Sequence, residues 1–394
     1  MNKPQAIVIG AGFTGVAVAY DLTQRGFDVK VLERGPLVNG TSGRTHGLLH
    51  SGARYAVDDQ ESAIECIDEN LILRKIVPQV IEPNGGLFVG LDESDLAYRD
   101  AFIKGCEDCH IPIEELSPQQ ALTMEPQLNP KLRTAFVVPD GTFDPLRLAM
   151  AFAASANFYG AEFYLFSEVD NFILDGLGHV KGVRYKDRSA NQPKEMFADI
   201  VINAAGVWAG EVLGKVGNIH LPIKPTPGVM VAYDQRLCHR VINRLNEPGD
   251  GDIIVPQRKM ITVGTTSFAA EDLDYIPVYA DQVKLMFDRG CELIPAIKNT
   301  KERGAFMASR PLLDSGTKGR SLTRTFKCFD HKESDNVDGL VTITGGKATT
   351  MRLMAEKTAD IVCQKLGINV ICQTAEIPIR SYRKFQIANK LEVQ

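Results

Sequence analysis

The sequence predicts an α/β fold that opens with a parallel βαβ unit. An apolar, strand-like run at residues 6–9 leads into a glycine-rich turn at 10–15, and a helix-prone run follows at 16–22. A second apolar strand at 28–32 ends on Glu33. Strand, glycine turn, helix, strand and acid stand in the order that a bound dinucleotide requires.

Each glycine of this turn has an expected task. Gly10 permits the tight turn, Gly12 lets the backbone approach a pyrophosphate, and Gly15 lets the helix pack closely on the strand. The free N–H groups and the dipole of the helix N-terminus favour the anion. Glu33 can accept hydrogen bonds from a ribose. A tight βα turn without a ligand is the alternative interpretation.

Length and composition restrict the class of protein. A chain of 394 residues exceeds one ordinary core, so we expect two domains. Hydrophobic residues make up 44%, charged residues 24%, and the formal net charge is -5. This composition is that of a soluble globular protein and predicts no nucleic-acid partner. No apolar run is long enough for a transmembrane segment, so we expect a cytoplasmic protein, with peripheral contact to the inner face of the cytoplasmic membrane left open.

The cysteines do not form a recognisable framework. All 8 are scattered along the chain, and the spacing of Cys106 and Cys109 falls within a helix-prone stretch without a second pair nearby. Two thiols on a helix are the favoured interpretation. The sequence therefore predicts no metal and no iron–sulfur cluster.

The pattern along the chain divides it into interleaved parts. Stretches 1–77, 140–215 and 337–372 are predicted to form a nucleotide-binding domain, and 78–139 with 216–336 a substrate domain. Residues 373–394 are predicted to be a C-terminal tail. Nicotinamide dehydrogenases usually keep the nucleotide domain in one block, so this discontinuous layout favours FAD, an extended ligand held by elements distant in sequence.

A set of motifs then indicates a family. They are Gly-Ala-Gly-Phe-Thr-Gly at 10–15, His-Gly-Leu-Leu-His-Ser-Gly-Ala-Arg-Tyr at 46–55, Val-Pro-Asp-Gly-Thr at 138–142, Asn-Ala-Ala-Gly-Val-Trp at 203–208, Gly-Thr-Thr-Ser at 264–267, Ser-Arg-Pro-Leu at 309–312, Phe-Asp-His at 329–331 and Thr-Ile-Thr-Gly-Gly-Lys at 342–347. With them the chain resembles FAD-dependent glycerol-3-phosphate dehydrogenases, most closely the catalytic subunit of the anaerobic enzyme. The resemblance implies a Rossmann-like FAD-binding domain of the glutathione-reductase-2/D-amino-acid-oxidase type. A mixed α/β substrate domain with an antiparallel sheet would be interleaved with it.

Three departures from the family pattern stand out. The family's Pro-x-Lys-Gly is here Pro-Thr-Pro-Gly at 225–228, and Ser309 replaces the residue, usually Val, that precedes Arg-Pro. The catalytic subunit of the anaerobic enzyme continues into a cysteine-rich, iron–sulfur-type C-terminal domain, which this sequence, ending at Gln394, does not include.

The resemblance implies oxidation of sn-glycerol 3-phosphate to dihydroxyacetone phosphate, with a hydride passing from C2 to flavin N5. Electrons would continue to a quinone or a partner subunit, with oxygen as a further option. A phosphate calls for converging cations. The resemblance implies Arg54, Arg310 and Lys347 for that task, with Arg324 as a weaker fourth. Lys347 could instead balance the charge of the reduced flavin.

The same resemblance suggests the remaining roles. Tyr55 would orient the substrate, and His50 is the expected base, with His46 as the alternative, because imidazole titrates in the useful pH range. The expected cofactor contacts, besides Gly10, Gly12 and Gly15, are Phe13, Thr14, Glu33, Arg34, Thr41, Ser42, Arg44, Thr45, His46, Gly47, Leu49, Val169, Ala204, Ala205, Gly206, Trp208, Gly345, Gly346, Lys347, Ala348 and Thr349.

Two competing functions stay open at this point. One keeps the fold and changes the substrate to a 2-hydroxy acid, an amine or another polyol phosphate. The other is a non-catalytic, flavin-bound subunit.

Overall fold

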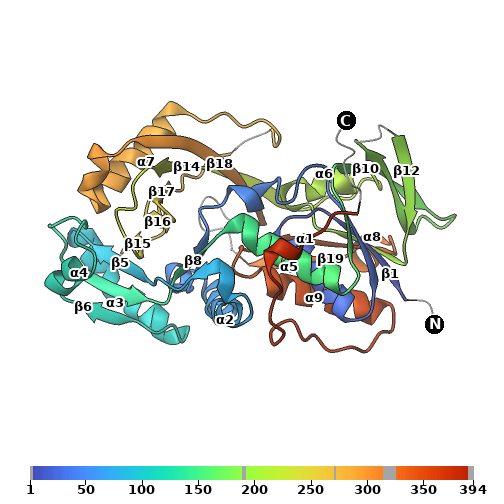
Figure 1. Ribbon diagram of the computed structural model, residues 1–394, viewed down its shortest axis with the longest axis horizontal. Coiled ribbons are helices and arrows are strands. Elements are labelled where there is room, and N and C mark those ends of the chain that lie inside the picture. Colours follow the sequence, from blue (N-terminus) through green and yellow to red (C-terminus); the bar gives the residue numbers. More distant parts are fainter. Residues whose placement is uncertain (1–2, 189–191, 270–271, 314–324, 389–394) are drawn as a thin grey trace.

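The computed structural model describes residues 3–188, 192–269, 272–313 and 325–388. Two large sheets lie in two lobes that are joined side by side (Figure 1). One lobe carries a six-stranded sheet and a small three-stranded sheet, and the other carries an eight-stranded sheet. Both termini of the chain lie at the lobe with the six-stranded sheet (Figure 1).

The six-stranded sheet is parallel except at one edge. In spatial order its strands are β19 (Phe326–Asp330), β20 (Leu340–Gly345), β13 (Ile200–Asn203), β1 (Gln5–Ile9), β2 (Asp28–Leu32) and β9 (Glu162–Tyr164). Only the edge strand β19 runs antiparallel to its neighbour. Central strands of such a sheet are covered on both faces, which explains why β1 and β13 are rich in buried apolar residues.

Different layers cover the two faces of this sheet. Ala6 and Val8 of β1 pack into a core with helices α1 (Phe13–Gln24), α5 (Pro145–Phe158) and α9 (Met351–Lys365). Ile7 and Ile9 point to the other face, because successive strand residues alternate. There the chain packs the three-stranded sheet of β10 (Ser167–Leu174), β11 (Val180–Asp187) and β12 (Gln192–Phe197), together with the short helix α6 (Ala209–Leu213).

The eight-stranded sheet is mostly antiparallel. Its order is β18 (Glu302–Leu313), β14 (Ile223–Tyr233), β17 (Met260–Gly264), β16 (Ile253–Gln257), β15 (Val241–Arg244), β5 (Gly86–Gly90), β7 (Thr134–Val138) and β6 (Glu114–Leu116). One face packs on α7 (Ala280–Leu293) and the other on α3 (Glu93–Asp108). The remaining elements are β3 (Leu48–Leu49), β4 (Ile81–Glu82), β8 (Gly141–Phe143), α2 (Gln60–Ile76), α4 (Pro118–Met124) and α8 (His331–Asp335).

Local signals explain several element ends. Asp59 caps α2, and its side chain accepts a hydrogen bond from the backbone N–H of Ser62. Ser117 and Gln120 form a reciprocal capping box at the start of α4, with Pro118 at its first position. Strands β10 and β11 form a hairpin around the glycine-containing turn 175–178, a sequence typical of a tight turn. These helices and this hairpin agree with the sequence pattern because contiguous residues determine them.

The structure differs from the expected layout at several points. Strands β6, β7, β15 and β18 of the eight-stranded sheet were not predicted. Strand β19 lies within the stretch 216–336 assigned to the substrate domain, yet it pairs with β20 in the six-stranded sheet. The described part of the expected tail, 373–388, packs on the lobe with the six-stranded sheet. Ile379 is buried, and its N–H donates to the carbonyl of Ile76. The N–H of Ala388 donates to the carbonyl of Phe163. The domain boundaries themselves stay a prediction.

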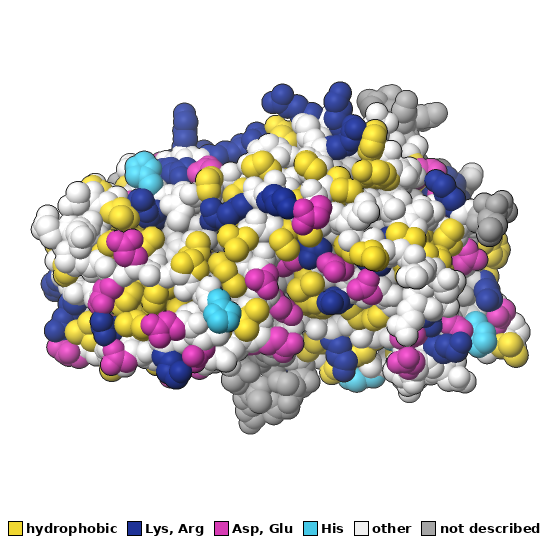
Figure 2. Space-filling model, turned by 90° about the horizontal axis from the view of Figure 1, so that it is seen from below, with side chains coloured by type: hydrophobic (Ala, Val, Ile, Leu, Met, Phe, Trp, Pro, Cys, Tyr) yellow, Lys and Arg dark blue, Asp and Glu magenta, His cyan; other side chains and the backbone are white. Residues whose placement is uncertain are grey.

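The surface and the helices carry two further observations. Acidic and basic side chains are interspersed over most of the face seen in Figure 2. Among the helices of the described ranges, none is long and apolar enough to cross a bilayer.

Candidate active site

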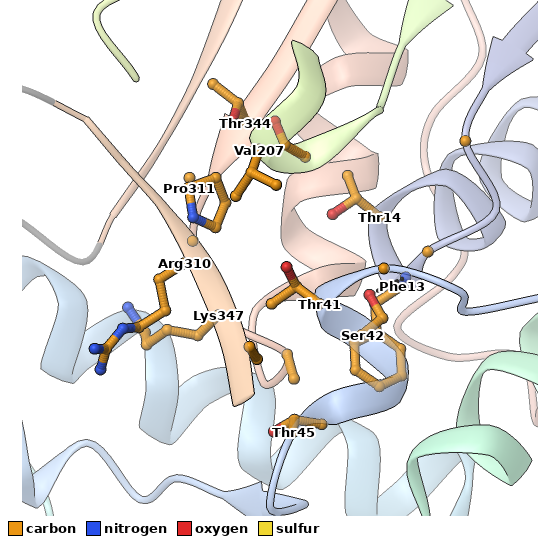
Figure 3. A pocket seen from close by; sticks show the side chains of 18 of the residues that line it. Phe13, Thr14, Thr41, Ser42, Thr45, Val207, Arg310, Pro311, Thr344 and Lys347 are labelled. Atoms are coloured by element: carbon orange, nitrogen blue, oxygen red, sulfur yellow. Dashed lines mark hydrogen bonds between the residues drawn. The ribbon is translucent and has the colours of Figure 1, made fainter. Parts of the chain in front are cut away.

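A cavity of about 850 Å³ lies where the two lobes meet. Its walls come from the glycine turn after β1, the loops around Thr41 and His50, the turn after β13, strand β18 and the turn after β20. This volume falls in the range of small-molecule sites. Figure 3 shows its two ends: Phe13, Thr14 and Ser42 lie to one side, and Arg310 and Lys347 to the other.

The glycine turn is built for a close backbone approach. Gly10 has φ 101°, and a Cβ there would lie 2.8 Å from the carbonyl oxygen of Ala204. A Cβ on Gly15 would collide with the carbonyl oxygen of Gly10. Gly15 does not line the cavity, so its task is the close packing of α1 on the turn. Gly10 and Gly12 do line it.

Glu33 lines the same end of the cavity, but its carboxylate already has partners. One oxygen accepts the N–H of Ala11 and the other that of Gly35, both at 2.9 Å. Burial raises the pKa of this carboxyl, and the two backbone N–H groups partly offset the effect. Each oxygen keeps a second lone pair. Glu33 therefore shapes the loop after β2 and still presents acceptors to a ribose.

Hydroxyl groups lie opposite the start of α1. The Oγ of Ser42 accepts the backbone N–H of Phe13 at 3.0 Å, so it sits at the helix N-terminus where an anion would be held. The hydroxyl of Thr41 donates instead to the carbonyl of Ser309 at 2.6 Å, and thereby joins this loop to β18. Arg34 lies over the ring of Trp208, 4.4 Å from its centre.

Together these features fit FAD. The cradle around Gly10 admits only a hydrogen atom, the N-terminus of α1 faces the cavity, and hydroxyl, carboxylate and aromatic groups surround it. The cavity then continues past Gly206 and Gly345 toward the cations at the far end. An extended dinucleotide needs this combination of a phosphate cradle and a long walled cavity.

Arg54 is the most informative cation of the far end. Its Nη2 donates to Oδ2 of Asp252 at 3.1 Å and to the carbonyl of Gly249 at 3.3 Å. Its Nη1 is buried and has no hydrogen-bond partner among the described residues. A buried guanidinium nitrogen without a partner is costly, so this edge of Arg54 points to an anionic ligand in the cavity.

Arg310 projects from β18 and is held by a network of oxygen acceptors. Its Nε donates to the carbonyl of Thr226, its Nη1 to the hydroxyl of Thr265 and its Nη2 to the carbonyl of Thr266, at 2.9–3.2 Å. These bonds fix the direction of the guanidinium group at the cavity wall. Thr265 belongs to the motif Gly-Thr-Thr-Ser at 264–267, to which the sequence assigned no role. In the structure this motif holds the guanidinium of Arg310 in place.

Lys347 follows the turn after β20 and is nearly buried. Its Nζ lies 5.1 Å from the ring centre of Tyr55 and 3.9 Å from Oε2 of Glu65. Lys347 and Tyr55 both line the cavity. Tyr55 is thus placed between Lys347 and His50, whose Nε2 is 3.5 Å from the tyrosine hydroxyl.

The two histidines are held in different ways. Burial, together with the charges of Arg310 and Arg54, lowers the pKa of His46 to about 4. Its Nδ1 accepts the N–H of Leu48 at 3.2 Å, so the neutral ring carries its proton on Nε2. His50 is held by its backbone, whose N–H donates to the Oγ1 of Thr349 and whose carbonyl accepts from Asn70.

The predicted residues are mostly, but not all, brought to the cavity. Arg44 lines a separate small hollow beside Trp208, while Gly47, Leu49 and Thr349 lie behind the wall. Arg324 lies outside the described residues. Sequence reasoning did not single out the acids at the far end, because single acids in loops carry no spacing signal; they are Asp58, Asp59, Glu247 and Asp252.

Two departures from the family pattern meet in space. Pro227, at the position of the missing lysine, pairs with Ser309 across β14 and β18. Neither residue lines the large cavity. Both positions are adjacent to residues of the wall, since Gly228, Ala308 and Arg310 line the cavity.

No metal site competes with this assignment in the part of the chain that the structure describes. There, no group of three or more His, Cys, Asp or Glu side chains is placed to hold an ion. Cys106 and Cys109 are buried free thiols.

Comparison with known proteins defines the class. The model of the DAO family, described as FAD dependent oxidoreductase, matches residues 5–361. The chain belongs to this family of FAD-dependent oxidoreductases, and its cofactor is FAD.

Two kinds of relative make the comparison more specific. The chain is 41% identical over 399 residues to the A1 chain of the anaerobic glycerol-3-phosphate dehydrogenase of Haloferax volcanii, covering 98% of this chain and 68% of that protein. It is 41% identical to the corresponding chain of the anaerobic enzyme of Escherichia coli (strain K12), covering 96% and 70%. The solved glycerol-3-phosphate dehydrogenase of Bacillus halodurans, complexed with FAD, superposes with a TM-score of 0.74 at 25% identity, covering 96% and 68%. These findings confirm the family resemblance and the fold class expected from the motifs.

Proposed function

We propose that this chain oxidises sn-glycerol 3-phosphate to dihydroxyacetone phosphate. The observation that carries the proposal is the unpartnered Nη1 of Arg54, buried in the wall of a cavity whose other end fits FAD. An anionic group of the substrate would satisfy that nitrogen. The sequence identity to two anaerobic glycerol-3-phosphate dehydrogenases supports a phosphorylated polyol as the substrate that bears this anionic group.

Three cations would hold the phosphate. Arg54, Arg310 and Lys347 line the same end of the cavity, and arginine presents paired N–H groups that match phosphate oxygens. A hydrogen bond to a charged group contributes about 1.5–3 kcal/mol. Tyr55, beside Lys347, would orient the carbon chain so that C2 lies toward the cofactor.

Bound FAD supplies the two-electron acceptor for the hydride that leaves C2. The chain's own task is to remove the hydroxyl proton, and we assign this to His50. Its Nε2 lies next to the hydroxyl of Tyr55, within the cavity. His46 is the weaker candidate, because its Nδ1 is occupied by Leu48 and its Nε2 carries a proton in the neutral ring. His46 would instead donate a hydrogen bond.

The electrons would leave to a quinone or to a partner protein of the same enzyme. Both anaerobic relatives are named as one subunit of their enzyme, which supports a multi-subunit assembly. We propose a cytoplasmic enzyme that contacts the membrane at most peripherally.

An anaerobic spectrum tests the activity. The purified holoprotein is mixed with sn-glycerol 3-phosphate, and the visible flavin absorbance should fall. Glycerol, a 2-hydroxy acid and an amine serve as comparison donors. If one of these donors bleaches the flavin absorbance and glycerol 3-phosphate does not, the substrate belongs to the class of that donor. Absence of bleaching by every donor would support a non-catalytic role.

A further inference from the structure

One buried acid at the far end of the cavity has no role in the mechanism above. Asp252 is the last residue of the turn 245–252, which connects β15 and β16 of the eight-stranded sheet. The glycine turn after β1 belongs to the other lobe. Its own carbonyl accepts the N–H of Arg244 at 2.9 Å, which fixes its backbone to the sheet. The next residue, Ile253, lines the cavity.

The carboxylate of Asp252 is held in one place. Its Oδ2 accepts the N–H of Gly249 and the Nη2 of Arg54. A Cβ on Gly249 would lie 2.9 Å from this oxygen, so glycine leaves the room that the carboxylate needs. The side chain of Asp252 is 3% exposed and that of Arg54 is 8% exposed. The pair is therefore a buried contact between two segments that lie 198 residues apart in the sequence.

The contact also determines which edge of Arg54 remains available. Both acceptors of the guanidinium, the Asp252 carboxylate and the Gly249 carbonyl, bind Nη2. The Nη1 edge stays without a partner among the described residues. Because the guanidinium is planar, fixing Nη2 fixes the direction of Nη1.

We propose that Asp252 is a positioning residue that aims Nη1 of Arg54 at the substrate phosphate and, through its negative charge, limits how tightly that phosphate is held. The two tasks have opposite effects on affinity. Aiming strengthens phosphate binding, whereas a carboxylate 3.1 Å from the guanidinium weakens its attraction for a second anion. An enzyme that must release a phosphorylated product needs both.

Two substitutions separate the tasks. Asp252→Asn keeps an oxygen acceptor of the same shape and removes the charge, so Arg54 stays aimed and phosphate binds more tightly. Asp252→Ala removes acceptor and charge together, so Nη2 loses a partner and the guanidinium is free to turn. Asp250→Asn is the matched control, since it removes a carboxylate from the same turn and leaves the contact between Asp252 and Arg54 in place.

The first measurement is calorimetric titration of each holoprotein with inorganic phosphate, which needs no turnover. We expect Asp252→Asn to lower the dissociation constant about threefold and Asp252→Ala to raise it about tenfold, the range of one charged hydrogen bond. Flavin content and melting temperature are recorded for each variant. If Asp252→Ala does not fold, the direction of the Asp252→Asn change decides.

Steady-state kinetics give the second readout, which rests on the proposed function. Asp252→Ala should raise KM for glycerol 3-phosphate far more than it changes kcat, and Asp252→Asn should lower both KM and kcat because product leaves more slowly. Wild-type protein that binds phosphate but is not reduced by glycerol 3-phosphate would contradict the proposed function and leave the calorimetric test valid. Weaker phosphate binding by Asp252→Asn, no change in either variant, or no phosphate binding by the wild type would overturn the role of Asp252.

Discussion

The two ends of the cavity are built in different ways. At the cofactor end, contiguous residues 5–33 supply a turn, a helix N-terminus and an acid, and the turn needs glycines because a Cβ would collide with backbone atoms. At the anion end, side chains from separate parts of the chain converge: Arg54, Asp252, Arg310 and Lys347. The first end depends on the absence of side chains, and the second on charged side chains held by tertiary contacts. Substitutions should therefore fail differently at the two ends.

The largest effect is expected at the cofactor end, for Gly15→Ala. The added Cβ meets the carbonyl oxygen of Gly10, and a backbone oxygen cannot move aside as a flexible side chain can. We expect loss of bound FAD and a stability loss of about 3 kcal/mol. The flavin-to-protein ratio and the melting temperature measure both. Gly217→Ala, where a Cβ meets nothing within 4 Å, is the control. A normal flavin content in Gly15→Ala would show that the turn accommodates a Cβ at position 15 and would contradict this prediction.

At the anion end, Arg54→Ala should spare the cofactor and damage turnover. The variant loses the unpartnered Nη1 and leaves Asp252 buried without its cation. We expect kcat/KM for glycerol 3-phosphate to fall at least about tenfold, and some loss of stability from the stranded carboxylate. Arg99→Ala, which removes a partly exposed arginine paired with Glu115, controls for loss of a cation in general. An unchanged kcat/KM would remove Arg54 from the substrate site.

A pH titration tests the burial of His46. Because the folded-state pKa of His46 is about 4, below the ordinary value of 6.5, the unfolded chain binds this proton first as the pH falls. The associated stability is complete above pH 6.5 and is lost between about pH 6.5 and 4. The slope contributed by His46 is at most about 1.4 kcal/mol per pH unit. His46→Asn should give a shallower fall of melting temperature over this range than the wild type does. Parallel curves would mean that His46 titrates normally.

The same contrast explains what the sequence could predict. The unit at 5–33 was predictable because spacing alone defines it, and the hairpin of β10 and β11 was predictable from its central turn. Strand β18 was missed because it begins with the charged, exposed pair Glu302 and Arg303, and its pairing with β14 is a tertiary property.

The anion end shows the same limit more sharply. Arg310 and Lys347 were assigned only through the family resemblance, since an isolated cation has no periodicity to mark it. Asp252 was not assigned at all, because its significance lies in a contact with Arg54, 198 residues away in the chain. A buried carboxylate is recognised only once its burial is known.

The smallest expected effect lies at the cofactor end itself, where a loop of the other lobe contacts Arg34 and Trp208. Asp274, from the lobe of the eight-stranded sheet, accepts a hydrogen bond from Nη2 of Arg34 at 2.7 Å and another from Nε1 of Trp208 at 3.0 Å. Arg34 and Trp208 line the cofactor end, so Asp274→Ala should loosen a wall of the FAD site without touching its cradle. Because Asp274 is 65% exposed, the ion pair is worth about 1 kcal/mol or less, and FAD should dissociate only about two- to fivefold faster.

The release of flavin fluorescence on dilution measures this rate, with Asp281→Asn, an exposed acid at the start of α7, as the control. High salt should bring the wild-type rate toward that of Asp274→Ala, since exposed ion pairs are screened. Identical rates in both proteins at low salt would mean that the cofactor end is held by its backbone cradle alone, which would make the contrast between the two ends complete.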